Sequence, residues 1–306
     1  MCDQFKNSMM LEFDMSDLGK MKYFLGVEVK QCSGGIFICQ RRYAKKLLTR
    51  FGMMDSNAVK NPIVSGTKLR KDDGNERVDE TQYKQVVGSL MYLIVSRPDL
   101  MYGVSLISRF SARPTKSHWL AAKRILRYIK GTTDLGVFYR KGESNFKLLA
   151  FTDSDYAGDL DDRRSTSGFV FMLGYGAISW GSKKQPVVAL STTEAEYIAA
   201  ALCACQCIWL RRVLKKIGLE EKTGTVIMCD NSSTIQLSKN PVFHGKSKHI
   251  DVKFHFLRDL VNDGIVNLSY CASENQVADI MTKPLKLEQF EKLRSMLRVT
   301  EITEVS

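Results

Sequence analysis

The sequence predicts a mixed α/β fold, in which helices flank a mixed five-stranded sheet. Three short runs rich in β-branched and aromatic residues follow one another at 147–152, 168–173 and 177–182, which indicates a hairpin meander. Two further runs, at 225–230 and 265–271, alternate with helical patterns, and this alternation indicates strands joined by helical crossovers. We therefore expect one sheet with both antiparallel and parallel neighbours.

Helical patterns fill the intervals between the later strands. The longest begins near Thr193 and ends at Gly218, a residue type that commonly follows the last turn of a helix. Shorter helices are predicted at 232–239 and 249–261, and a final helical region begins at Asn275. The expected order from residue 147 onward is therefore β-β-β-α-β-α-α-β-α.

A smaller segment, made of a hairpin and several helices, precedes this sheet. The β-rich runs at 22–30 and 36–40 flank a Ser-Gly-Gly turn signal. In the last of the helices that follow, Leu120, Ile125 and Ile129 are expected to face the core. The predicted helices lie at 41–51, in a stretch that ends near Ser96, at 100–110 and at 117–130, with a long connection over 55–82.

The chain has 306 residues, which corresponds to roughly two domains of about 150 residues each. The change in pattern predicts a first domain at 1–145 and a second at 146–300. No apolar run approaches the about 20 residues that a membrane-spanning helix needs, and the N-terminus lacks the apolar stretch of a signal peptide. We expect a cytoplasmic or nuclear protein that is not secreted and has no membrane partner.

Positive charge is concentrated in the first half. The whole chain has a net charge of +12. Residues 1–150 contain 26 Lys and Arg against 14 Asp and Glu, whereas the remainder contains 19 of each kind. The stretch from Arg109 to Lys141 holds nine basic residues and one acid, Asp134. A short basic run is usually a solvated helix face, but a long run of one sign is typical of a surface that neutralises phosphates, so we favour a polyanionic partner.

Four acidic residues stand where strands end or helices begin. Asp153 ends the first strand of the predicted sheet and Asp230 ends the fourth, while Glu196 and Asp279 lie near helix starts. The strand ends of an open α/β sheet meet in the crevice where ligands bind. Carboxylates brought together there repel one another unless a cation is present, and such oxygen ligands suit Mg²⁺. The four residues therefore predict a divalent-cation site, and two cations about 3.5–4 Å apart form a phosphodiester-cleaving pair.

Each of these acids also has a structural alternative. Asp155 alternates to the same face as the first acid and could be the strand-end ligand in its place. Asp230 followed by Asn231 is consistent with a helix N-cap. Glu194 stands three residues after a serine and is explained as a capping-box residue, which leaves Glu196 without such a structural role.

The second half contains, in order, the blocks FTDSDYAGD, RRSTSGFVFMLG, ISWGSKKQ, LSTTEAEYIAA, CDNSSTIQLSKNPVFHGKSKHIDVKFHFLRD and ASENQVADIMTKPL. These blocks resemble the ribonuclease H domain of copia-type LTR retrotransposons. The first half contains DLGKMKYFLGVEV, QRRYAKKLLTRFGM, VGSLMYLIVSRPDLMYGVSLISRF and HWLAAKRILRYIKGT. They resemble the upstream part of the same Pol polyproteins, namely the end of the reverse transcriptase palm, the thumb and the connection.

This resemblance implies a ribonuclease H-like mixed sheet preceded by a small reverse transcriptase remnant. It implies Mg²⁺-dependent endonucleolytic hydrolysis of the RNA strand of RNA–DNA hybrids, with two Mg²⁺ ions for which Mn²⁺ can substitute. The family's catalytic, metal-binding quartet maps onto Asp153, Glu196, Asp230 and Asp279. No Y-x-D-D motif occurs, so polymerase activity is expected to be absent. If the chain is expressed, we expect it to be located in a retroelement particle. We also expect it to associate with itself or with other parts of the polyprotein.

Two sets of residues are predicted to contact nucleic acid. Candidates for contacts with the 2′-hydroxyls across the minor groove are Ser154, Arg163, Ser165, Thr193 and Asn231, which are near the quartet in sequence. Candidates for contacts with the backbone of the hybrid are Lys123, Arg124, Arg127 and Lys130. The alternative function is that of an inactive remnant of a degenerate retroelement, which binds nucleic acid without cleaving it.

Overall fold

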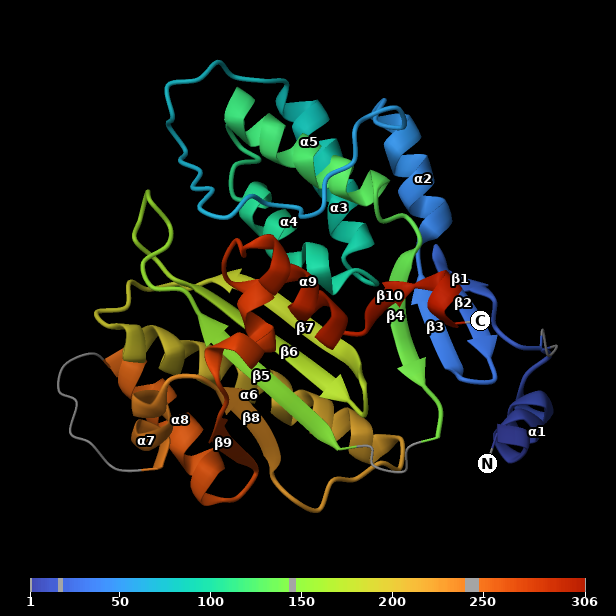
Figure 1. Cartoon of the computed structure of the whole chain (residues 1–306). Helices are drawn as coiled ribbons and strands as arrows, with labels where there is room; N and C mark the ends of the chain where they lie inside the picture. The colour runs from blue at the N-terminus through green and yellow to red at the C-terminus, as the bar shows by residue number, and fades with distance from the viewer. Residues whose placement is uncertain (1, 16–18, 143–146, 240–247, 306) are drawn as a thin grey trace.

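The computed structural model describes residues 2–15, 19–142, 147–239 and 248–305. Its strands form two five-stranded sheets, which helices cover (Figure 1). The first sheet contains strands from both ends of the chain, and the second sheet lies wholly in the second half. The mixed α/β class that the sequence predicts is therefore confirmed.

The second sheet has the mixed pairing that the sequence predicts. Its order is β7-β6-β5-β8-β9, with β5 (Leu148–Ser154) in the centre. The strands β6 (Thr166–Leu173) and β7 (Gly176–Lys184) continue from it as antiparallel neighbours. On the other side, β8 (Thr225–Cys229) and β9 (Val266–Tyr270) pair in parallel. Because β5 and β8 run in the same direction, their carboxyl ends lie side by side.

Helices lie on both faces of the second sheet (Figure 1). α6 (Thr192–Lys216) packs along β5, β6 and β8, and α7 (Ser232–Lys239) and α8 (Lys248–Asn262) contact α6 in turn. The opposite face contacts α4 (Met101–Ser108) and the 3-10 helix η3 (Val277–Met281). The helices on this opposite face come from both halves of the chain.

The first sheet is antiparallel throughout and joins the two ends of the chain. Its order is β1-β2-β3-β4-β10. The first four strands are β1 (Tyr23–Phe24), β2 (Val27–Cys32), β3 (Gly35–Cys39) and β4 (Leu135–Arg140). The fifth, β10 (Val299–Glu301), pairs with β4 after the whole second sheet has intervened in sequence.

The remaining helices surround these sheets. α3 begins after Asp79, whose side chain accepts a hydrogen bond from the backbone N–H of Gln82, and α5 ends at Gly131 as the sequence predicts. These helices are α1 (Cys2–Glu12), α2 (Arg41–Arg50), α3 (Glu80–Leu93), η1 (Pro98–Leu100), α5 (Lys116–Lys130), η2 (Ser273–Asn275), α9 (Leu287–Met296) and η4 (Ile302–Val305).

One cluster of buried apolar side chains extends across the predicted domain boundary. It includes Leu90 and Val104 from the first half together with Val170, Ala177 and Leu293 from the second. A separate cluster fills the space between α6 and the second sheet. The division into 1–145 and 146–300 stays a prediction, and the shared cluster means that the two halves pack against each other.

A buried ion pair fixes the centre of this contact. Arg97 donates two hydrogen bonds to Asp99, at 2.9 and 2.7 Å, and both side chains are almost fully buried. The hydroxyl of Tyr128 donates to Asp99 and accepts from Arg294 of α9, so the network reaches from the first half to the second. Burial opposes ionisation of Asp99, but Arg97 outweighs that effect and holds the pKa of Asp99 below its ordinary value.

Most of the predicted elements are present, and three predictions are corrected. The run at 22–30 is divided into β1 and β2 at Leu25 and Gly26, which both have positive φ. The final helical region is a 3-10 helix followed by a separate α-helix. Leu120 is 59% exposed, because it lies about 180° around α5 from the buried Ile129. α1, β4 and β10 were not predicted.

Although the sequence has no uninterrupted apolar run of membrane-spanning length, α6 as a whole is long and apolar enough, by length and composition alone, to cross a membrane. In this structure 56% of its most apolar stretch is buried. The helix lies between the second sheet on one side and α7 and α8 on the other. Its apolar composition is therefore accounted for by its place in the core.

We expect the variant Arg97→Met to lose about 3–5 kcal/mol of unfolding free energy, because it leaves the buried carboxylate of Asp99 without a countercharge. The matched control is Lys84→Met, which removes a cation from the exposed pair with Glu80 and should cost less than about 1 kcal/mol. Urea unfolding followed by circular dichroism measures both. Equal midpoints for the two variants would show that the buried pair does not support the fold.

Candidate active site

The parallel pairing of β5 and β8 brings two of the predicted acids together. Asp153 is the penultimate residue of β5, and Asp230 directly follows β8. Asp153 is 1% exposed, whereas Asp230 is partly exposed and accepts a hydrogen bond of 2.8 Å from the hydroxyl of Ser273. Both acids therefore stand at the same edge of the sheet, as the sequence predicts.

Glu196 reaches this edge from the first turns of α6. The helix begins at Ser191, whose side chain accepts a hydrogen bond from the backbone N–H of Glu194. Glu194 in turn accepts from the backbone N–H of Leu190, the residue before the N-cap, so it caps the start of the helix but does not close the predicted capping box onto Ser191 itself. Glu196 is left to point at β5, where its Oε1 accepts from the backbone N–H of Ser154 at 3.2 Å.

Asp279, in η3, completes the group. Carboxylate oxygens of Asp153, Asp230 and Asp279 all lie within 4.8 Å of one another. The hydroxyl of Thr282, just after η3, donates to Asp153 and fixes that carboxylate. The structure therefore brings together the four acids that the sequence singles out, and their role in catalysis stays a prediction.

Burial makes this concentration of negative charge costly. Burial first, and then the charges of Asp153 and Asp230, raise the pKa of Glu196 well above its ordinary value. Burial and Asp153 likewise raise the pKa of Asp279. The Oε2 atom of Glu196 is buried and accepts no hydrogen bond from any residue that the structure describes. A buried oxygen of this kind, among hard carboxylate ligands, fits a divalent cation.

The structure adds one charged residue that the sequence analysis missed. The ammonium of Lys283 lies 2.9 Å from Asp279 Oδ1 and 3.6 Å from Asp153 Oδ2. Burial opposes its charge, but Asp153 and Asp279 outweigh that effect and raise the pKa of Lys283 above its ordinary value. The signal was present in the sequence, because a lysine four residues after an acid lies on the same side of a helical turn.

The structure also separates the structural alternatives. Asp155 accepts a hydrogen bond from the backbone N–H of Thr166, burial raises its pKa to about 6, and it is outside the set of acids that lie within 4.8 Å of one another. The N-cap of α7 is Asn231, whose Oδ1 accepts from the backbone N–H of Thr234 at 2.9 Å. Asp230 is therefore not needed as a cap.

The five residues proposed to contact the 2′-hydroxyls divide into two groups. Arg163 is exposed at positive φ, while Thr193 and Asn231 are partly exposed and stand close in sequence to Glu196 and Asp230. Ser165 is fully buried and its hydroxyl accepts from the backbone N–H of Ala157, so it supports the loop after β5 instead of facing a ligand. Ser154 is partly exposed, but its hydroxyl is held by neighbouring groups.

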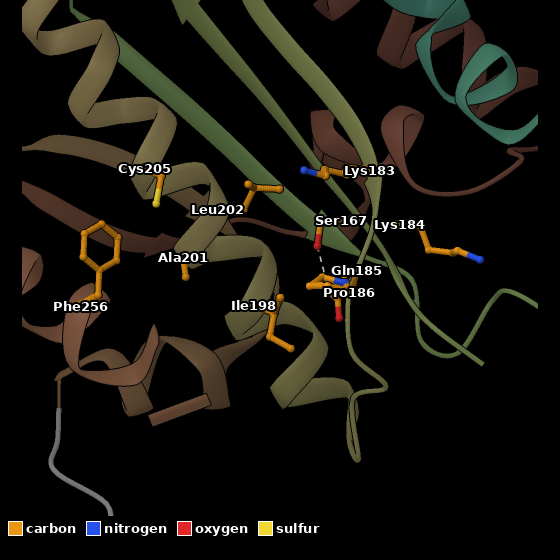
Figure 2. A pocket seen from close by; sticks show the side chains of 10 residues that line it. All are labelled: Ser167, Lys183, Lys184, Gln185, Pro186, Ile198, Ala201, Leu202, Cys205 and Phe256. Atoms are coloured by element: carbon orange, nitrogen blue, oxygen red, sulfur yellow. Dashed lines mark hydrogen bonds between the residues drawn. The ribbon is translucent and has the colours of Figure 1, made fainter. Parts of the chain in front are cut away.

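Gln185 is a positioning residue that sequence reasoning missed. It is 3% exposed, and its side-chain N–H groups contact the hydroxyls of Ser154 and Ser167 and the carbonyl of Ala195. Figure 2 shows the bond to Ser167 at the wall of an apolar pocket between the end of β7 and α6. Gln185 thus joins β5, β6 and α6, and it stabilises the strand end on which Asp153 stands.

The four basic residues proposed to contact the hybrid lie on α5, which is separated from the second sheet by α4 (Figure 1). All four are partly buried. Arg124 donates to Asn61, and Arg127 donates to the carbonyl of Asn57 at 2.7 Å, while Lys123 lies over the ring of Trp119. The arginines are therefore partly engaged in holding the long connection.

Comparison with known proteins places the chain in a family. Residues 1–65 match the family model of the reverse transcriptase (RNA-dependent DNA polymerase). Over 290 residues, 95% of this chain, the sequence is 39% identical to the retrovirus-related Pol polyprotein from transposon RE2 of Arabidopsis thaliana. Over 301 residues it is 40% identical to the Pol polyprotein from transposon TNT 1-94 of Nicotiana tabacum, again with 95% of this chain covered. The chain belongs to the copia-type family of retrotransposon Pol polyproteins.

The matched segment is a small part of those relatives. It covers 20% of the RE2 polyprotein and 22% of the TNT 1-94 polyprotein, so this Pol segment spans about a fifth of their length. Among solved structures, LC11-RNase H1 in complex with an RNA/DNA hybrid overlaps 44% of this chain and 94% of its own, with 14% identity and a TM-score of 0.34. Because this TM-score is low, the family assignment depends on the sequence relatives and not on the structural overlap.

We expect Lys283→Met to tighten the binding of Mg²⁺ by roughly tenfold, the ratio that corresponds to about 1.4 kcal/mol of removed repulsion. In EDTA the same variant should unfold at a lower temperature, because the buried acids lose their resident positive charge. Calorimetric titration and thermal unfolding measure the two effects. Lys283→Arg is the control, because it keeps the charge. Unchanged Mg²⁺ affinity in Lys283→Met would mean that the ammonium does not compete with the cation.

Proposed function

We propose that this Pol segment hydrolyses the RNA strand of RNA–DNA hybrids with the help of Mg²⁺ or Mn²⁺. The observation that carries this proposal is the convergence of Asp153, Glu196, Asp230 and Asp279 at one edge of a mixed sheet. Burial, and then the charges of neighbouring acids, raise the pKa values of Glu196 and Asp279, and clustered acids of this kind are typical of a functional cation site. Membership in a Pol family that combines reverse transcriptase and ribonuclease H segments supports the same reaction.

The four acids would hold the cations, which supply an activated water and stabilise the leaving oxygen during phosphodiester cleavage. The other residues at this edge hold the acids in place. The backbone N–H of Ser154 orients Glu196, the hydroxyl of Thr282 orients Asp153, and the hydroxyl of Ser273 orients Asp230. Fixed orientations of this kind reduce the reorganisation that the reaction requires.

The hybrid itself would be recognised by shape and charge. Arg163 is exposed, and Thr193 and Asn231 are partly exposed, so these three residues are suitable for contacts with 2′-hydroxyls or phosphates across a wide minor groove. The exposed sides of Lys123 and Lys130 on α5 would meet the backbone farther along the duplex. Binding without cleavage is the competing outcome, and the assays below distinguish it from hydrolysis.

We expect Asp230→Asn to abolish hydrolysis of a labelled hybrid while the affinity for the hybrid persists, because the change removes a cation ligand but keeps the size of the side chain. The matched control is Asp259→Asn on the exposed side of α8, which should cleave at the wild-type rate. Cleavage is measured with Mg²⁺, with Mn²⁺ and with EDTA. A wild-type chain that binds the hybrid but cleaves it under none of these conditions is a binding module only.

We expect the double variant Lys123→Ala, Lys130→Ala to bind the hybrid more weakly and with a shallower salt dependence. Each lost phosphate contact should reduce the slope of log affinity against log salt by about 0.9 on the scale established for duplex DNA. Lys45→Ala, Lys46→Ala is the control, because it removes two exposed cations from α2 instead. If both double variants give the same slope, α5 does not contact the nucleic acid.

A further inference from the structure

A thiol lies among the acids of the candidate active site. Cys229 is the last residue of β8 and is fully buried. Its Sγ, a carboxylate oxygen of Glu196 and a carboxylate oxygen of Asp230 all lie within 4.8 Å of one another. This group has one sulfur and two oxygens, whereas the group formed by Asp153, Asp230 and Asp279 has oxygens only. The two groups share Asp230 and differ in the class of cation that they suit.

Ligand chemistry distinguishes the two groups. Mg²⁺ takes oxygen ligands, whereas thiolates select softer cations such as those of zinc and its heavier relatives. Tetrahedral zinc binds sulfur at about 2.3 Å and carboxylate oxygen at about 2.0–2.2 Å, so its ligand atoms stand about 3.6 Å apart. The ligand atoms of this group lie within 4.8 Å of one another, so binding of such a cation requires side-chain rotation to bring them closer.

A second observation points to a ligand at the same place. Glu196 is 6% exposed, and its Oε2 is the buried oxygen that accepts no hydrogen bond from the described residues. Its other oxygen is already held by the backbone N–H of Ser154. One oxygen of Glu196 is therefore fixed by a backbone donor, and the other is buried without a donor among the described residues.

We propose that Cys229, Glu196 and Asp230 form a binding site for a thiophilic divalent cation. When the cation binds, a metal–sulfur bond forms, the S–H bond of Cys229 breaks, and its proton passes to the buffer, with no change of oxidation state. Because Glu196 and Asp230 are shared with the proposed Mg²⁺ site, a soft cation held here blocks hydrolysis. This inhibitory consequence and the competition with Mn²⁺ described below rest on the proposed function, whereas the site itself does not.

The test uses Cd²⁺ as the probe and the full chain in the absence of reducing thiols. Titration should give an ultraviolet charge-transfer band of cadmium–thiolate bonds, and the variant Cys229→Ser should lose one equivalent of it. The matched control is Cys271→Ser, because Cys271 is also buried beside the acids but lies outside the three-residue group. It should keep the full band. A full band in Cys229→Ser, or an equal loss in Cys271→Ser, overturns the proposed site.

Two further measurements test whether the variants are folded and whether cadmium and manganese compete for the same acids. Near-ultraviolet circular dichroism shows whether each variant is folded, and Cys229→Ala serves as the second substitution if Cys229→Ser is not. In the wild type, excess Mn²⁺ should reduce the band by the same one equivalent, because the two cations share Glu196 and Asp230. In a chain whose hydrolysis of the hybrid Mn²⁺ supports, a band that excess Mn²⁺ leaves intact places the cadmium elsewhere and also overturns the proposal.

The inhibitory consequence has its own readout. The Cd²⁺ concentration that fills the Cys229-dependent band should stop hydrolysis of the hybrid in the presence of Mg²⁺. Undiminished hydrolysis at that concentration contradicts the inhibition. If the chain shows no hydrolysis at all, the proposed function fails, while the absorption experiment still decides whether the thiophilic site exists.

Discussion

Three carboxylates of this Pol segment stand within 4.8 Å of one another at the ends of buried elements, with a fourth beside them. Each loses hydration there and gains a like-charged neighbour, so the arrangement raises the free energy of the folded state unless positive charge is supplied. Lys283 supplies one such charge within the chain. The surrounding hydroxyl and backbone donors, from Ser154, Ser273 and Thr282, each hold one acid in orientation. The positions of Lys283 and of these donors are thus explained by the need to offset the repulsion between the acids.

Interactions elsewhere in the chain supply the folding free energy that offsets this repulsion. The pair of Arg97 and Asp99 lies in the contact between the two halves, and Tyr128 extends it to Arg294 of α9. The shared apolar cluster contains side chains of η3, the element that carries Asp279. A change in the first half can therefore alter the position of an acid in the second half through packing alone. Measurements of function therefore require the full chain.

The sequence predicted the second sheet well and the first sheet only in part. The strand runs of the second sheet are rich in β-branched and aromatic residues and are bounded by turns, so local pattern was sufficient. In contrast, β10 has only three residues and forms by pairing with β4, a strand more than 150 residues earlier, which no local pattern reveals. The acids were predictable because strand ends converge, and Lys283 could have been found from its spacing to Asp279. Gln185 could not have been found in this way, because its partners come from three different elements.

The pairing of β10 with β4 has a consequence for how the chain acquires its fold during synthesis. A ribosome releases β4 long before β10, so the edge of the first sheet stays open while the whole second sheet is made. An open edge is a template for pairing with another chain. A messenger that ends after residue 283 and before residue 299 yields a protein that contains all four acids but leaves β4 uncovered. Shortened copies of this segment are thus expected to aggregate through β4 even where every acid is intact.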